Sequence, residues 1–266
     1  MASAVVCNLC SESFASRNKL FAHIAKSHGK ITASSESVVD AQPLKKIKID
    51  LKELENKIVT IDEDDQYRVI FKPQGIATMG AKGPTLISSS RMLLPNALEQ
   101  NLPYKKAVPC HRLDRDTGGL VICSKNFKSQ VALSGSFRYK FVYKKYLAMV
   151  HGKLEPSSGY ITTPISDKSA ITKYNVTRYT PSAQHGTVST VELFPVTGRK
   201  HQLRRHLQSL GHAILGDRRY SFAASWPPEQ YPYMFLFAVG IELPHPSEYE
   251  RVLQLSGQSV TAGLLM

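Results

Sequence analysis

The sequence has no run of about eighteen apolar residues, and its first residues lack the basic segment followed by an apolar stretch that marks a secretory signal. We therefore expect neither a membrane-spanning helix nor secretion. Cysteine is scarce, with four residues in 266. Cys7 and Cys10 form a CxxC pair, whereas the spacing of Cys110 and Cys123 does not indicate a disulfide. This usage fits an intracellular, reducing compartment, which is the cytoplasm or the nucleus, with the mitochondrion left open.

Acidic residues are also outnumbered, because 34 lysines and arginines against 21 aspartates and glutamates give a formal net charge of +13. Such an excess indicates a polyanionic partner. Nucleic acid is the first interpretation and an anionic membrane surface the second, which the lack of an apolar segment weakens. The length allows one full domain plus a small module, and 42% hydrophobic residues is ordinary for a globular protein.

The first thirty residues carry the spacing of a tetrahedral zinc site, with the candidate Zn²⁺ ligands Cys7, Cys10, His23 and His28. Phe14 and Leu20 supply the two apolar positions that so small a unit needs besides its metal. The stretch resembles the C2H2 zinc fingers, which implies a ββα fold and a structural role for the metal.

One finger reads only about three base pairs, so its affinity alone is limited. Lys19 is the one convincing reader of a base edge among the positions that would face DNA. We therefore expect the finger to bind either an RNA backbone or a protein partner, and the sequence leaves both open.

The residues after the finger read as a connector. Residues 32–43 are rich in small and polar types and read as a linker. Residues 44–58 then fit both a helical and a strand period. The sequence therefore predicts a finger over residues 1–30, a linker and amphipathic connector over 31–62, and the main domain over 63–266.

Two segments of the main domain bring charged side chains to loops. Residues 67–72 read as a strand that delivers Lys72 to a turn at 72–75. Asp114 then lies between Arg112 and Arg115, on a loop with adjacent glycines that precedes a short apolar strand at 120–123. Adjacent glycines allow a close approach of the backbone to another group.

Two later segments supply an aromatic residue and a cationic helix. Residues 141–150 alternate as a strand, as do residues 187–194, and this alternation turns Tyr146 toward an apolar interior. Residues 198–212 contain a predicted helix with an apolar stripe, which Gly211 terminates. The density of cations on its other faces indicates nearby phosphates or a buried carboxylate; these cations are Arg199, His201, Arg204, Arg205 and His206.

These four segments, in this order, resemble the RluA-type RNA pseudouridine synthases over about residues 67–246. The resemblance implies an α+β fold with a large mixed, mainly antiparallel sheet, flanking helices and a central cleft. It also implies a monomer that isomerises uridine to pseudouridine in structured RNA without a catalytic cofactor. The compact chain favours tRNA over rRNA as the substrate.

The resemblance also implies roles for single residues. Asp114 is the catalytic nucleophile, Arg204 pairs with it and keeps it anionic, and Tyr146 stacks on the uracil and helps to remove its C5 proton. Arg112 enters the RNA stack where the target base leaves it. The expected RNA-binding residues are Arg112, Lys72, Arg199 and His201.

Two alternatives stay beside this interpretation. One is an RNA-binding zinc-finger protein whose synthase domain is inactive. The other is a metal-dependent nuclease or phosphatase that uses Asp114, Asp116 and His111. Gly118, where many members of the family have serine, keeps a small residue in the motif, and the loop near Trp226 receives no role.

Overall fold

The computed structural model describes residues 51–80, 85–94, 104–183, 185–221, 231 and 233–256, together with 5, 6, 12–14 and 23. Three of the candidate zinc ligands, Cys7, Cys10 and His28, lie outside these residues, as do the linker and Trp226. None of the helices within them is long and apolar enough to cross a lipid bilayer.

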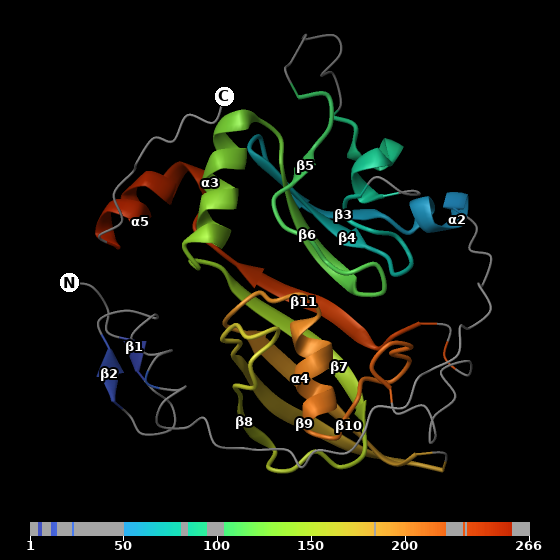
Figure 1. Cartoon of the computed structure of the whole chain (residues 1–266). Coiled ribbons are helices and arrows are strands. Elements are labelled where there is room, and N and C mark those ends of the chain that lie inside the picture. The colour runs from blue at the N-terminus through green and yellow to red at the C-terminus, as the bar shows by residue number, and fades with distance from the viewer. Residues whose placement is uncertain are drawn as a thin grey trace.

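A large sheet organises the main domain (Figure 1). Its strands follow one another in the order β3 (Val59–Glu63), β4 (Tyr67–Lys72), β6 (Gly118–Ser124), β11 (Leu236–Glu242), β7 (Tyr143–His151), β10 (Gly186–Pro195), β9 (Thr172–Ser182) and β8 (Ser158–Ile161), with β5 (Val108–Pro109) beside β6. The β6–β11 pair is parallel and the other pairs are antiparallel. The predicted mixed, mainly antiparallel sheet is confirmed.

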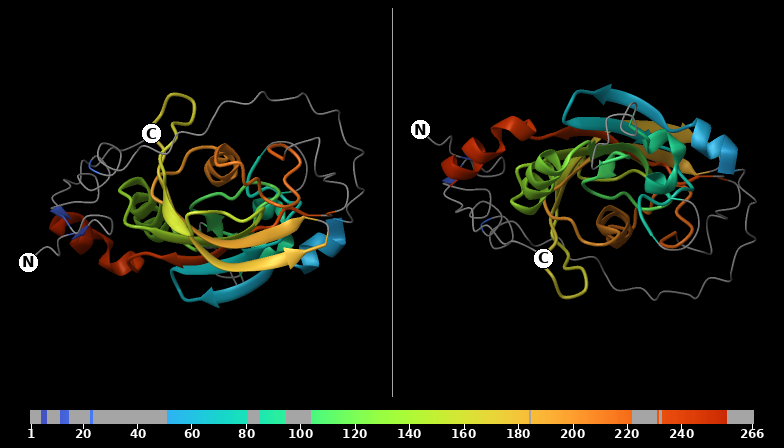
Figure 2. Two further views of the ribbon diagram at one scale, coloured as in Figure 1. Left: turned by 90° about the horizontal axis from the view of Figure 1, so that it is seen from below. Right: turned by 90° about the horizontal axis from the view of Figure 1, so that it is seen from above.

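Two of the described helices, α3 and α4, cover one side of this sheet (Figure 2). The described helices are α2 (Leu51–Asn56), α3 (Phe127–Arg138), α4 (Gln202–Ser209) and α5 (Tyr249–Leu255). The end-on views of Figure 2 show α3 and α4 on the same side, where α3 accompanies the half of the sheet around β6 and α4 the half around β10.

Two hydrophobic clusters form the core, one under each half of the sheet. Alternation in β4 buries Ile70 in the first cluster, and the leucine stripe of α4 buries Leu203 and Leu207 in the second. Tyr146 of β7 packs against both clusters. Residues of β7 near Tyr146 therefore lie where the two halves of the domain meet.

The strands expected at 67–72, 120–123, 141–150 and 187–194 are confirmed within a few residues, and α4 ends before Gly211, whose φ is +79°. The ambiguous connector contains the helix α2. The strand β3 was not predicted: only Val59 and Ile61 alternate with polar residues in it, and all five of its residues are exposed. The sheet thus begins at Val59, inside the segment that the sequence assigns to the connector.

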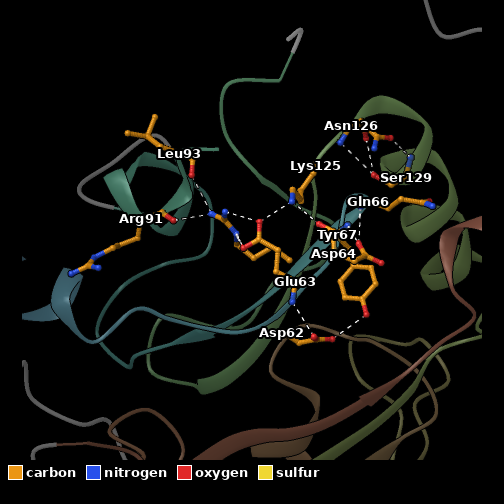
Figure 3. Close-up of polar contacts among 11 residues, drawn as sticks. Asp62, Glu63, Asp64, Gln66, Tyr67, Arg91, Leu93, Lys125, Asn126 and Ser129 are labelled. Atoms are coloured by element: carbon orange, nitrogen blue, oxygen red, sulfur yellow. Dashed lines mark hydrogen bonds and ion pairs between the residues drawn. The ribbon is translucent and has the colours of Figure 1, made fainter. Parts of the chain in front are cut away.

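A partly buried charge network fixes β3 and β4 to their surroundings (Figure 3). Arg68 is 5% exposed and donates two hydrogen bonds to Glu63, while its third nitrogen donates to the carbonyls of Arg91 and Leu93. Lys125 adds a second cation, with its Nζ 2.8 Å from Glu63 Oε1. Bidentate charge-assisted bonds of this kind restrict geometry strongly. They hold β4, and with it the turn that carries Lys72.

Near the N-terminus, β1 (Val5–Val6) pairs with β2 (Ser13–Phe14) in antiparallel register, and His23 is helical. The Nδ1 atom of His23 lies 3.2 Å from Glu12 Oε2. The zinc finger expected over residues 1–30 stays a prediction, because most of these residues lie outside the described part of the chain.

Candidate active site

A cleft of about 630 Å³ opens between the loop before β6 and the start of α4, with β7 along its floor. Six of the seven residues expected to act in catalysis or RNA binding line it: Asp114, Tyr146, Arg204, Arg112, Arg199 and His201. These six residues come from the loop before β6, from β7 and from the start of α4, so the folded domain brings together side chains from separate parts of the sequence.

Two cationic or titratable groups face the carboxylate of Asp114. The Nη1 atom of Arg204 lies 3.8 Å from Oδ2, and the Nε2 atom of His201 lies 3.7 Å from Oδ1. Both distances exceed hydrogen-bonding range, so the interactions are electrostatic. The Asp114 side chain is 27% exposed and opens into the cleft. The predicted approach of Arg204 to Asp114 is therefore present, but as a looser contact than a direct pair.

The close partner of Arg204 is Asp217. Arg204 Nε and Nη2 each donate a 2.7 Å hydrogen bond to this carboxylate, and both side chains are buried. Burial opposes the charge of Arg204, but the bonds to Asp217 outweigh it and raise the pKa of the guanidinium. Asp217 is thus the buried carboxylate that the cationic helix indicated. Its role was missed because the sequence gives no sign that residues 204 and 217 meet.

Asp217 also builds the turn that carries Tyr220. Its Oδ1 accepts hydrogen bonds from the backbone amides of Arg219 and Tyr220 at 3.0 and 3.1 Å. The Tyr220 ring then lies 4.9 Å from the guanidinium carbon of Arg204, a cation–π contact, and its hydroxyl is 2.9 Å from His201 Nδ1. One tyrosine therefore touches both groups that face Asp114.

His201 adopts a conformation that non-glycine residues rarely take. Its φ of 56° lies in the left-handed region, immediately before α4 begins. Such conformations persist only where the surroundings hold them, and they concentrate at functional sites. The bond to Tyr220 is one such constraint. Burial, only partly opposed by the charge of Asp114, lowers the pKa of His201.

Tyr146 lines the same cleft from β7. Its ring packs against both core clusters, which fixes its plane beside the cavity. Burial, reinforced by the negative charge of Asp114, raises the pKa of Tyr146 above its usual range. The side chain is therefore a neutral phenol at neutral pH, with a ring face suited to stacking on a base.

Lys72 is the exception among the predicted site residues, because it does not line the cleft. It is fully buried, and its Nζ donates to the carbonyls of Pro73, Ile76 and Arg115 at 2.8, 2.8 and 3.3 Å. Burial lowers the pKa of Lys72 to about 7 against the opposing charges of Asp116 and Asp114. A lysine at a strand end looks exposed in the sequence, and its loop partners are visible only in three dimensions.

The contacts of Lys72 tie the turn after β4 to the loop that carries Asp114. The amide of Gly75 also donates to the Arg115 carbonyl, at 2.9 Å, and the guanidinium of Arg115 returns a bond to the Gly75 carbonyl. Thr78 adds a reciprocal pair of 3.0 Å bonds with the backbone of Leu113. The backbone on both sides of Asp114 is therefore held by the segment after β4.

The adjacent glycines of the motif serve the packing of the sheet. Gly119 has a φ of +114°, and a Cβ there would lie 2.1 Å from the Ala238 carbonyl oxygen of β11. The close backbone approach expected from the sequence is thus an approach to a neighbouring strand. It brings the parallel strands β6 and β11 together beneath the Asp114 loop.

The other charged or titratable residues that the sequence singled out differ in their exposure and in whether they line the cleft. Arg112 and Arg199 are exposed at the cleft, and Arg199 Nε donates to the Ser169 carbonyl. Asp116 is exposed and does not line the cleft. His206 is buried between Thr172 and Thr163, away from any phosphate. Within the described ranges, no three histidine, cysteine or carboxylate side chains gather as a metal site requires.

Known proteins share this sequence pattern. The family described as RNA pseudouridylate synthase matches residues 66–209. The ribosomal large subunit pseudouridine synthase C of Rickettsia bellii is 37% identical over 223 residues, which cover 76% of this chain and 70% of that protein. The mitochondrial pseudouridylate synthase RPUSD4 of Xenopus tropicalis is 32% identical over 228 residues, covering 73% and 69%.

Other similarities agree with these. The dual-specificity RNA pseudouridine synthase RluA of Vibrio vulnificus is 33% identical over 176 residues, covering 60% of this chain and 68% of that protein. The chain spans 65% of the synthase C proteins of Rickettsia typhi and Rickettsia prowazekii. The fold matches human RNA pseudouridylate synthase domain containing 1 with a TM-score of 0.58 and 23% identity, over 73% and 81% of the two chains. The chain therefore belongs to the RNA pseudouridylate synthase family and is an RNA pseudouridine synthase, an isomerase.

Proposed function

We propose that the protein isomerises uridine in structured RNA and that Asp114 is the carboxylate that acts on the target nucleotide. The observation that carries this proposal is the position of Asp114 in the cleft, where Arg204 and His201 face its two oxygens. In the reaction, the bond between uracil N1 and ribose C1′ breaks and a bond between C5 and C1′ forms. C5 loses its proton and N1 gains one, so the atoms balance without a further reagent.

The neighbouring residues support this chemistry. Arg204 places positive charge 3.8 Å from the carboxylate of Asp114. Tyr146 offers a fixed ring to the uracil after it leaves the RNA stack. Arg112 is exposed at the cleft and carries a planar cation that can stack in place of the extruded base.

The choice of RNA is a second part of the proposal. The compact chain favours tRNA, while the names of the similar proteins point to ribosomal RNA and to a dual specificity. We keep tRNA as the first substrate to test and ribosomal RNA fragments as the second. An intracellular, reducing compartment is proposed as well, and the name of the Xenopus relative makes the mitochondrion one of the places to examine.

Release of tritium from C5-labelled uridine RNA tests the activity. The wild-type protein is expected to release tritium in proportion to the pseudouridine formed, and Asp114→Asn to release none. Asp116→Asn is the matched control, because Asp116 is exposed and does not line the cleft. Equal release by Asp114→Asn would reject the role of Asp114. No release by the wild-type protein would favour an RNA-binding protein with an inactive synthase domain.

We also propose a structural Zn²⁺ bound by Cys7, Cys10, His23 and His28. The donor set is that of a tetrahedral site, and the antiparallel pairing of β1 with β2 before a helical His23 supports the fit. The metal would stabilise the finger and take no part in catalysis. The finger is proposed to bind RNA or a protein partner and to be joined by a linker to a monomeric catalytic domain.

A further inference from the structure

The cleft extends beyond the residues that face Asp114. Cys110, His111, Phe137 and Lys144 line a second part of it, and none of these side chains has a role in the isomerisation as proposed. Lys144 and Tyr146 are two residues apart on β7, so they project from the same face of the sheet. The rise of a strand separates them by about 7 Å. Lys144 therefore lies one short step along the cleft from the ring proposed to hold the target base.

The ammonium group of Lys144 has an unusual lack of partners. Among the described residues, no hydrogen-bond acceptor and no carboxylate pairs with it, although the side chain is partly buried. Its neighbour Lys145 forms a 2.6 Å ion pair with Glu192, and Lys125 pairs with Glu63. Burial, and then the charge of Lys140, lowers the pKa of Lys144. A partly desolvated cation in a cleft is a favourable place for an anion.

Two aromatic rings lie in the same part of the cleft. Phe137 and His111 stack with their ring centres 4.6 Å apart and their planes at 26°. His111 Nε2 accepts a 3.0 Å hydrogen bond from the Ile122 amide, which fixes the imidazole. Burial, and secondarily the charge of Lys144, lowers the pKa of His111 to about 3, so the ring is neutral at neutral pH. The pair is thus a flat, uncharged surface beside a cation that has no partner among the described residues.

We propose that Lys144 and the Phe137–His111 ring pair form a subsite for the RNA nucleotide next to the target uridine. Lys144 binds the phosphate between the two nucleotides, and the ring pair stacks against the neighbouring base. Single-stranded RNA is commonly held by such a combination of cations and aromatic faces. The inference rests on the proposed function only in that RNA must bring its target uridine into this cleft.

The salt dependence of RNA binding tests the phosphate contact. Affinity for RNA falls as salt rises, so the slope of log affinity against log salt concentration is negative. Each lost contact with a single-stranded phosphate decreases the magnitude of this slope by about 0.7. Lys144→Gln is expected to show this decrease, and Lys144→Arg to keep the wild-type slope. Lys145→Gln is the matched control, because its ammonium pairs with Glu192 on the adjacent strand. A wild-type slope in Lys144→Gln would overturn the subsite.

A chemically modified RNA identifies the phosphate. A short RNA with one neutral methylphosphonate linkage, placed on either side of the target uridine, removes a single charge. At one of the two positions, the wild-type protein is expected to bind the modified RNA as weakly as Lys144→Gln binds the unmodified RNA. Lys144→Gln is expected to bind the modified and the unmodified RNA equally well. If, for both modified RNAs, the fold-loss of affinity caused by Lys144→Gln and that caused by the methylphosphonate multiply when the two changes are combined, Lys144 does not contact these phosphates.

Substitution of Phe137 tests the ring contact separately. Phe137→Leu keeps an apolar side chain but removes the aromatic face, and affinity is expected to fall by about 5-fold or more without a change of salt slope. Phe127→Leu, at an exposed position of the same helix, is the control. Unchanged affinity in Phe137→Leu would overturn the stacking role.

These measurements use binding alone, so they separate the subsite from the catalytic proposal. Wild-type RNA binding with no effect of Lys144→Gln or Phe137→Leu would overturn the subsite and leave the role of Asp114 intact. If the wild-type protein bound no RNA, the proposed function and the subsite would both be rejected. Thermal unfolding of each variant verifies that the fold is retained.

Discussion

Asp217 holds Arg204 through two 2.7 Å hydrogen bonds and so directs the remaining guanidinium nitrogen toward Asp114. Because the fork of a guanidinium is planar and rigid, this pair sets where its third nitrogen lies. The positive charge beside Asp114 is therefore positioned by a second carboxylate that is buried and does not line the cleft. Asp114 itself, at 3.8 Å, is not restrained by a short bond to Arg204.

Asp217→Asn is expected to lower both stability and activity. The change leaves a buried guanidinium without its opposite charge, which typically costs about 3–5 kcal/mol in the free energy of unfolding. It also weakens the turn that carries Tyr220. Chemical denaturation measures the first effect and tritium release the second. The exposed Asp116→Asn should change neither, and a stable, fully active Asp217→Asn would show that Asp217 does not position Arg204.

Tyr220→Phe separates two contacts of one side chain. The ring over Arg204 remains, whereas the hydrogen bond to His201 Nδ1 is lost, at a net cost of about 1 kcal/mol in stability. We expect kcat to fall while the affinity for RNA stays close to that of the wild-type protein. Tyr220→Leu also removes the cation–π contact and should reduce kcat further. Equal kcat in wild-type and Tyr220→Phe proteins would mean that the position of His201 does not matter to the reaction.

Tyr146→Phe distinguishes stacking from proton removal. The raised pKa of Tyr146 makes its phenolate scarce at neutral pH, but a phenol can stack equally well. Tyr146→Phe keeps the ring, so RNA affinity is expected to be unchanged and tritium release to be slowed. If release were as fast as in the wild-type protein, the hydroxyl would have no part in removing the C5 proton, and stacking alone would remain.

The sequence predicted residues that reach the cleft from their own motifs, and it missed contacts made with a residue far away in the sequence. Asp114, Tyr146 and Arg204 lie in separate motifs, and the fold brings all three to one cleft. Lys72 was assigned to RNA because its carbonyl partners, including Arg115 forty-three residues away, cannot be read from the chain. Asp217 carried no predicted role for the same reason.

The same distinction applies to the fold. Strand β4 was predicted from its run of β-branched and aromatic residues, and β10 was predicted from its apolar alternation. The edge strand β3 is exposed throughout, so backbone pairing with β4 defines it and its side chains do not. The nearby strand β11 was not predicted either, and the tight contact of Gly119 with its backbone became visible only in the sheet.

Lys72→Met is expected to alter stability and activity but not electrostatic binding of RNA. Three backbone carbonyls would lose their donor, at about 1–3 kcal/mol for each buried group left unpaired, and the loop that carries Asp114 would be less firmly held. Since Lys72 is buried, the slope of log affinity against log salt should equal that of the wild-type protein. A less steep slope in Lys72→Met than in the wild-type protein would indicate that Lys72 contacts RNA.

The pH dependence of stability provides a second measurement on Lys72. The pKa of Lys72 is about 7 in the folded protein and 10.5 for an ordinary lysine, as in the unfolded chain. The unfolded chain therefore binds more protons than the folded protein between these two pH values. The cost of burying the ammonium is complete below pH 7 and is relieved as the pH rises toward 10.5. The unfolding free energy of the wild-type protein should therefore rise relative to that of Lys72→Met over this range. A constant difference would show that Lys72 stays charged in the fold.

Removal of residues 1–30, or of zinc by a chelator, is expected to leave the catalytic domain folded. In the described residues of this region, β1 pairs with β2 and His23 contacts Glu12, so the contacts are local. A zinc finger contains its own core around the metal and unfolds when the metal is lost. The truncated protein should therefore keep the thermal unfolding of its main transition and release tritium from a short RNA, while binding long RNA or a protein partner more weakly. Metal analysis should find one zinc per full-length chain and none after truncation or in Cys7→Ser with Cys10→Ser. If truncation unfolded the whole chain, residues 1–30 would be an integral part of the catalytic domain.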